Sequence, residues 1–166
     1  MATKNEWKKL RYFKPNSKYD NWGDSELIDF EHLLRLDDFR HFLNSPVYVV
    51  QGVNTSGHAT KSYHYPQNGA CATDIVVPDY EGSFIQLVLD AERFGFNGLG
   101  AYPHWHYYGE NTGGLHLDSR PLQWEKDETL NYRQSRWMGV KRNGSQIYIP
   151  LTYKNLLKYS TEAKNG

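Results

Sequence analysis

The stretch ATDIVVP at residues 72–78 predicts a buried β-strand with a carboxylate in its middle. The run Ile75–Val77 is β-branched, and Pro78 ends it because proline has no backbone N–H to donate to a sheet. Burying Asp74 in such a strand is costly unless a cation or several hydrogen-bond donors face it. We therefore expect this strand to lie in the core and Asp74 to belong to a polar site.

Clear secondary-structure patterns precede this strand. Residues from Asp24 or Ser25 to Asn44 place apolar side chains at helical spacing, so they predict one long helix or two short ones. Val47–Val50 predicts a strand, since it is β-branched and aromatic and follows Pro46. The segment between the two strands, residues 52–69, has no apolar period and is expected to be a long functional loop.

The residues after the strand add a helix and more strands. Ser83–Gln86 reads as a capping box that opens a helix to about Phe94. Further predicted elements are short strands at Leu99–Tyr102 and Leu115–Leu117 and a helix over Leu151–Tyr159. Ser145–Ile149 predicts a last strand, or a hairpin with Trp137–Lys141 turned by Asn143-Gly144.

This order of elements predicts an α+β domain with helices on a small, mostly antiparallel sheet. A chain of 166 residues is expected to form one domain, residues 1–166. Within it, residues 1–23 are expected to be an irregular lead that packs on the core through Trp7, Tyr12, Phe13 and Trp22, and residues 160–166 a polar tail.

Composition excludes several classes of protein. The 19 Lys and Arg residues balance the 19 Asp and Glu residues, so no net charge favours nucleic acid or anionic lipid, and we expect no nucleic-acid partner. One cysteine, Cys71, excludes an intramolecular disulfide and a cysteine-rich zinc finger. No apolar run approaches the ~20 residues of a membrane span, and the first residues do not resemble a secretory signal.

The histidines are unevenly distributed. His32 and His41 lie in the first predicted helix, where we expect solvated or helix-packing side chains, whereas the other five lie in or beside the glycine-rich segments. His64, Asp74 and His116 could form a site with two imidazoles and one carboxylate, which is a zinc ligand set. In the alternative interpretation, His116 is a strand histidine that binds Asp118 or a backbone carbonyl.

Three blocks of sequence resemble a known family. Ser62-Tyr63-His64 with Ala72-Thr73-Asp74 is similar to the S-x-H-x-x-G-x-A-x-D signature of the zinc D-alanyl-D-alanine peptidases. That group includes zinc D,D-dipeptidases and phage L-alanyl-D-glutamate endolysins and has a hedgehog-like fold. Gly98–Pro103 resembles their G-x-G-x-Y-P block, and His116-Leu117-Asp118 with Arg120 resembles H-x-D-x-R.

The resemblance implies a zinc peptidase of the bacterial cell wall. His64, Asp74 and His116 would bind Zn²⁺, and a water in the remaining position would attack a peptide bond of peptidoglycan. Asn54, Ser62, Tyr63 and His106 would contact the substrate. The protein would be a monomer made in the cytoplasm without a signal peptide, and it would reach the cell wall by another route.

The chain also departs from the family pattern. Nine residues separate His64 from Asp74 where the signature has six, so Tyr65–Gly69 must bulge or the match is offset, and His58 is an alternative ligand from the same loop. Gly113 stands where many relatives have an acidic general base, which leaves Asp118, Glu110, His104 and His106 as candidates. Asp118 could instead orient His116. Asn54 replaces an arginine that contacts substrate in many relatives.

Two other classes of function fit the same residues. A peptidoglycan-binding module without catalysis could keep the fold and the metal, as Gly113 and Asn54 favour. In a structural protein, His116 and Asp118 would simply be a hydrogen-bonded pair.

Overall fold

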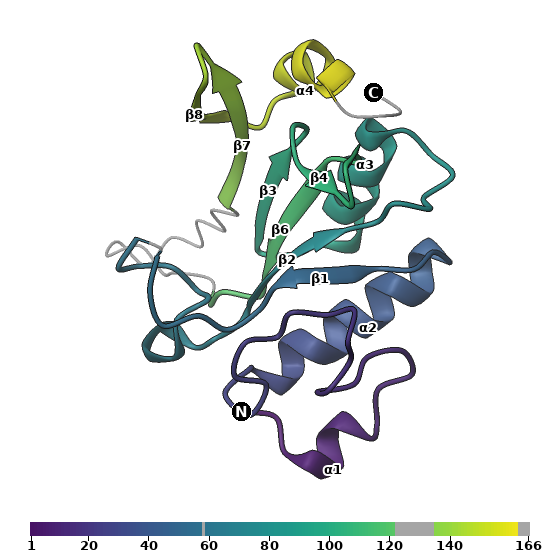
Figure 1. Cartoon of the computed structure of the whole chain (residues 1–166), viewed down its shortest axis with the longest axis vertical. Helices are drawn as coiled ribbons and strands as arrows, with labels where there is room; N and C mark the ends of the chain where they lie inside the picture. The colour runs from purple at the N-terminus through teal and green to yellow at the C-terminus, as the bar shows by residue number, and fades with distance from the viewer. Residues whose placement is uncertain (58, 122–134, 163–166) are drawn as a thin grey trace, which may run out of the picture.

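The computed structural model describes residues 1–57, 59–121 and 135–162 (Figure 1). The helices are α1 (Lys4–Trp7), α2 (Phe30–Leu43), α3 (Phe84–Phe94) and α4 (Tyr153–Tyr159), with 3-10 turns η1 (Pro66–Asn68) and η2 (Ser160–Glu162). The strands are β1 (Tyr48–Gln51), β2 (Ala72–Val76), β3 (Gly98–Tyr102), β4 (His106–Tyr107), β5 (Glu110–Asn111), β6 (Gly114–Asp118), β7 (Ser135–Arg142) and β8 (Ser145–Pro150).

Six of these strands form one mixed sheet in the order β1-β2-β6-β3-β7-β8. The pairs are antiparallel except β3 with β7, which is parallel. The short strands β4 and β5 form a separate hairpin between β3 and β6. The structure therefore confirms the predicted α+β class and the mostly antiparallel sheet.

Alternation along the strands gives the large sheet two different faces. One face carries Leu99, Leu117 and Met138, which are fully buried in a core shared with α2 and α3. Figure 1 shows α2 running beside β1, with α1 below it and the β7–β8 hairpin and α4 at the other end of the molecule. The opposite face of the same strands carries Asp74, His116 and Asp118.

The predicted strands and the C-terminal hairpin are confirmed, but α2 starts later than Asp24 or Ser25. The helix begins at Phe30 because Asp29 is its N-cap, with a side chain that accepts a hydrogen bond from His32 N. The backbone N–H of Asp29 donates to Ala70 O. This contact holds the chain in an extended conformation at the position where the apolar spacing alone predicts helix.

The expected irregular lead contains one helical turn, α1, which begins with a capping box between Thr3 and Glu6. Its packing role is confirmed for Trp7, Phe13 and Trp22, which are buried and meet edge to face. Tyr12 differs, because it is 39% exposed.

The predictions for the start of α3 and for the C-terminal tail are confirmed in part. Ser83 accepts from Gln86 N at the start of α3, but the Gln86 amide donates to Asp90, so half of the capping box is seen. Residues 160–162 continue α4 as η2, and residues 163–166 of the expected tail lie outside the described residues. Among the described residues, no helix is both long enough and apolar enough to span a bilayer.

Candidate metal centre

Strand register brings the candidate ligands together. Asp74 on β2 is paired with His116 on β6, and His116 is paired with Gly100 on β3. Residues paired in neighbouring strands project from the same face of a sheet. His64 reaches this face from the loop after β1, where its backbone carbonyl accepts from Asn54 N. Segments 52 residues apart in the sequence thus meet at one point.

Three side-chain atoms converge at this point. His116 Nδ1 lies 2.8 Å from Asp74 Oδ1, and His64 Nε2 lies 3.3 Å from the same oxygen. The two imidazole nitrogens are 3.2 Å apart. His64, Asp74 and His116 are all buried, and they form a group that could hold a metal ion.

The outer hydrogen bonds determine which nitrogen atoms face the centre. His64 Nδ1 lies 2.7 Å from Gly52 O, and a carbonyl can only accept, so Nδ1 carries the proton and Nε2 presents its lone pair. His116 Nε2 lies 3.0 Å from the Asp118 carboxylate, so Nε2 donates and Nδ1 faces inward. His64 Nε2, His116 Nδ1 and Asp74 Oδ1 therefore face one place.

Such a set of acceptors requires a positive charge between them, either a proton or a metal ion. Zinc is bound tetrahedrally by imidazole nitrogen and carboxylate oxygen at about 2.0–2.2 Å, which places ligand atoms about 3.3–3.6 Å apart. Two of the separations in this chain, 3.2 and 3.3 Å, are near the lower end of that spacing, whereas His116 Nδ1 and Asp74 Oδ1 lie at a hydrogen-bond distance of 2.8 Å and would have to move apart by about 0.5 Å to hold the ion. The donor set and the protonated outer nitrogens fit a divalent ion with one ligand position left over.

The electrostatics of the group favour positive charge. Burial by itself would lower the pKa of His116, but hydrogen bonds with Asp118 and Asp74 outweigh it and raise the pKa to about 9. Burial by itself would raise the pKa of Asp74, but hydrogen bonds with His116 and His64 hold it well below its ordinary value. Asp74 is therefore ionised at neutral pH.

Asp118 lies behind His116 and away from solvent. It is fully buried, accepts from His116 Nε2, and forms an ion pair with Arg120, whose Nε donates to Asp118 Oδ1 at 2.7 Å. Gly98 makes room for it, since a Cβ on Gly98 would lie 2.0 Å from Asp118 Oδ2. The geometry therefore favours Asp118 as a residue that orients His116 over Asp118 as a general base.

A cleft of about 530 Å³ opens over the three candidate ligands. Ser62 and Tyr63, expected to contact substrate, both line it. The Ser62 hydroxyl accepts from His64 N, and the Tyr63 ring lies 4.6 Å from the Arg120 guanidinium. Lys61 also lines the cleft, so the described residues give its rim two basic side chains, Lys61 and Arg120.

Other predicted site residues lie outside the lining of this cleft. The Asn54 side chain accepts from Thr55 N and Ser56 N in its own loop. His106 and Glu110 are exposed on the β4–β5 hairpin, and His104 Nε2 contacts Gln146 Oε1. His58 lies outside the described residues. The structure thus does not bring Glu110, His104 or His106 to the three ligands.

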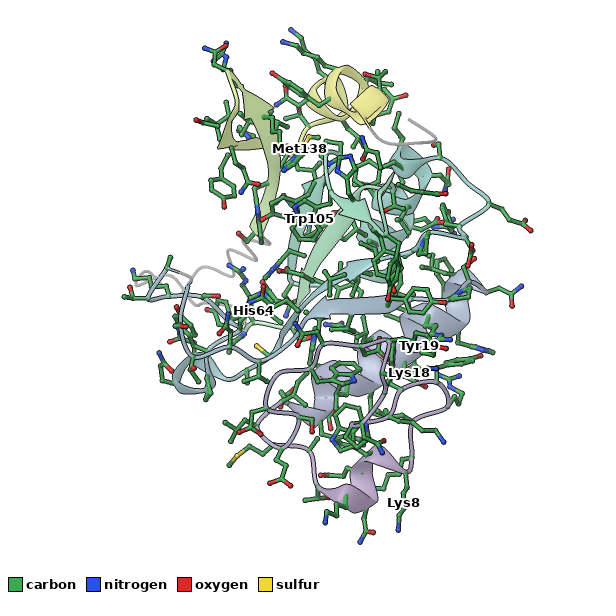
Figure 2. All side chains as sticks on the ribbon, viewed as in Figure 1. Lys8, Lys18, Tyr19, His64, Trp105 and Met138 are labelled. Atoms are coloured by element: carbon green, nitrogen blue, oxygen red, sulfur yellow. The ribbon has the colours of Figure 1, made fainter. Side chains whose placement is uncertain are left out.

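The cleft also contains residues that the sequence analysis missed as site residues. Tyr102, Trp137, Gln146 and Tyr148 line it, and the Trp137 ring lies 5.0 Å from the His116 ring. In the view of Figure 2, Trp105 lies between His64 and Met138. Alternation along the strand could have placed Gln146 and Tyr148 on one face of β8. No sequence pattern, however, indicates that this face lies near His64.

Two residues singled out in the sequence, His32 and Cys71, are buried structural residues. His32 lies inside the protein between Thr73 and Ser119, with contacts of 3.0 and 2.9 Å, so it packs α2 against the sheet. Cys71 is buried, and burial raises its thiol pKa to about 12, which makes it a poor nucleophile.

No protein-family model, curated protein or solved structure matches this chain. The function must therefore be argued from the residues around the cleft.

Proposed function

We propose that this protein is a zinc-dependent peptidase that hydrolyses a peptide bond of bacterial peptidoglycan. The observation that carries the proposal is the convergence of His64 Nε2, Asp74 Oδ1 and His116 Nδ1, with both outer imidazole nitrogens already bonded. Imidazole nitrogens oriented in this way by carbonyl and carboxylate groups are typical of zinc sites.

The proposed reaction divides the work between metal and protein. A bound zinc ion would polarise a peptide carbonyl and lower the pKa of a water to about 7. Gly52 and Asp118 would keep the two imidazoles in the tautomer that can bind the ion. Arg120 would keep Asp118 charged, since their ion pair holds the pKa of that carboxyl below its ordinary range despite burial.

The substrate class rests on the resemblance of three sequence blocks, together with the cleft. A cleft of about 530 Å³ can accept a short peptide segment. The blocks S-x-H, G-x-G-x-Y-P and H-x-D-x-R resemble those of the D-alanyl-D-alanine peptidases and phage endolysins. We extend the proposal accordingly to their hedgehog-like fold and to a monomer that acts at the cell wall.

A non-catalytic peptidoglycan-binding module is the second candidate, and one observation favours it. Among the described residues that line the cleft, Asp74 is the one carboxylate, so the cleft shows no separate acidic base. Gly113, at the position where many relatives have that base, is buried, and a Cβ there would contact Phe84.

Digestion of purified peptidoglycan separates the two candidates. The enzyme should release new amino termini when supplied with zinc, and chelation or the change His116→Ala should abolish release. A binding module should sediment with peptidoglycan and release no amino termini at any zinc concentration. Failure both to cut and to bind would reject both candidates.

A further inference from the structure

Aromatic rings from β3, the loop after it and β7 form one wall of the metal cleft. Tyr102 and Trp105 stack with ring centroids 4.2 Å apart, and Trp137 Nε1 donates to the Tyr102 hydroxyl at 2.9 Å. Glycines allow this packing. A Cβ on Gly100 would lie 2.5 Å from the Trp137 ring, and a Cβ on Gly139 would lie 2.3 Å from the Tyr102 ring.

One hydrogen bond within this wall has a fixed direction. An indole N–H can only donate, so the Tyr102 oxygen must accept from Trp137. Tyr102 is 8% exposed, so this hydrogen bond holds two rings of the wall together in a nearly buried position.

A donor on the same strand reaches the Tyr148 oxygen. Gln146 Nε2 donates to it at 2.8 Å, and the other end of the amide, Oε1, lies 3.1 Å from His104 Nε2. The Tyr148 hydroxyl thus accepts from Gln146, which leaves its O–H proton for another acceptor. Tyr148 lines the metal cleft and is 65% exposed, so a bound ligand can reach this proton.

Register places this hydroxyl beside the metal site. Tyr148 is paired with Gly139, and it projects from the sheet face that carries His116 and Trp137. Under the proposed function a peptide binds beside the Tyr148 hydroxyl, and the carbonyl oxygens of that peptide can accept a hydrogen bond from it.

We propose that Tyr148 is a substrate-binding residue whose hydroxyl donates a hydrogen bond to a carbonyl oxygen of the peptide bound in the cleft. Gln146 is a positioning residue, because its amide N–H occupies a lone pair of the Tyr148 oxygen and so directs the O–H elsewhere. This inference rests on the proposed function and adds a contact that none of the sequence blocks contains.

The change Tyr148→Phe tests the contact, because it keeps the ring and removes the hydroxyl. Loss of one hydrogen bond should raise KM for soluble peptidoglycan fragments by about 3- to 10-fold, with little change in kcat, zinc content or Tm. Tyr153→Phe is the matched control, since Tyr153 is also 65% exposed but lies on α4 outside the cleft lining. It should leave KM unchanged.

The change Gln146→Glu tests the direction of the donor. A carboxylate in this place would accept the Tyr148 proton instead of donating to the oxygen, so it should raise KM as much as Tyr148→Phe does. The double variant should be no worse than either single variant, because both remove the same contact. Normal KM in both single variants would overturn the inference.

The test separates this inference from the proposed function. Cleavage by the parent with equal KM in Tyr148→Phe would reject the Tyr148 contact and leave the peptidase proposal standing. If the parent does not cut, the dissociation constant for peptidoglycan fragments, measured by tryptophan fluorescence, replaces KM. Weaker binding by Tyr148→Phe then supports the contact, and equal binding rejects it. Absence of both cutting and binding in the parent rejects both proposals.

Discussion

At the scale of single residues, the candidate metal centre is supported by a carboxylate that does not face the cleft. Asp118 accepts from His116 and Arg120 while fully buried, so it can act on the centre only through them. Changing Asp118→Asn should weaken zinc binding by about 10- to 100-fold, because the inward lone pair of His116 is no longer fixed. Competition against a chromophoric chelator measures this affinity.

The control for this prediction is turnover measured at saturating zinc. An Asp118→Asn variant that binds zinc normally but has lost its turnover would show that Asp118 is a general base and would contradict the orienting role.

Gly98 is tied to the same carboxylate. The change Gly98→Ala would place a methyl group 2.0 Å from Asp118 Oδ2, so either the strand or the carboxylate must move. We expect destabilisation of about 1–3 kcal/mol, as for other overpacked sites, together with weaker zinc binding. Chemical denaturation and zinc titration measure the two effects.

A double-mutant cycle identifies the cause. If Gly98→Ala acts on zinc through Asp118, its effect on affinity should largely disappear in the Asp118→Asn background. Additive losses of affinity would contradict this coupling.

At the scale of elements, His32 couples α2 to the sheet and makes stability depend on pH. Burial lowers the His32 pKa from 6.5 to about 3, so the folded protein keeps this imidazole neutral. The unfolded chain binds a proton there below pH 6.5, and stability must fall as pH falls from 6.5 toward 3. At pH 5 the loss should reach about 2 kcal/mol.

Urea unfolding at pH 7 and pH 5 checks this prediction. The groups that act on His32 electrostatically are Asp118, His116, His64 and Arg35. The variant His32→Gln keeps these groups and lacks the titrating imidazole, so it should lose clearly less stability than the parent over the same interval. Equal losses would show that His32 does not titrate on unfolding.

The six strands of the large sheet were predictable from local sequence, whereas β4 and β5, of two residues each, were not. The β-branched runs of β1 and β2 and the Asn143-Gly144 turn need no distant partner to be recognised. The start of α2 was not predictable, because it depends on the hydrogen bond from Asp29 N to Ala70 O across 41 residues. Apolar spacing alone does not report such a contact.

At the scale of the whole molecule, the site combines a predictable centre with an unpredictable wall. His64, Asp74 and His116 stood out because polar residues in or beside apolar strands require partners. Trp137 and Tyr148 come from a hairpin that reaches the cleft through the parallel pairing of β3 with β7. No local sequence pattern predicts that β7 pairs with β3, because this strand order depends on how the whole sheet assembles.

Metal removal should destabilise the entire fold, since the ligands join the loop after β1 to two central strands. Binding stabilises the folded state by mass action, by about 4 kcal/mol when free zinc is a thousandfold above Kd. Thermal unfolding in zinc and in chelator should therefore give a higher Tm in zinc for the parent and the same Tm in both for His116→Ala.

His106→Ala is the matched control, because His106 is an exposed histidine on β4 outside the cleft lining. It should respond to zinc like the parent. A zinc response in His116→Ala as large as that of the parent would contradict a ligand role.

Elemental analysis of the purified protein tests the central claim most directly, namely that His64, Asp74 and His116 together hold one divalent ion. After dialysis against zinc and removal of the excess, the parent should retain one equivalent of zinc per chain, and Asp74→Ala should retain almost none. A parent that retains no metal, or an Asp74→Ala variant that retains as much zinc as the parent, would contradict the claim.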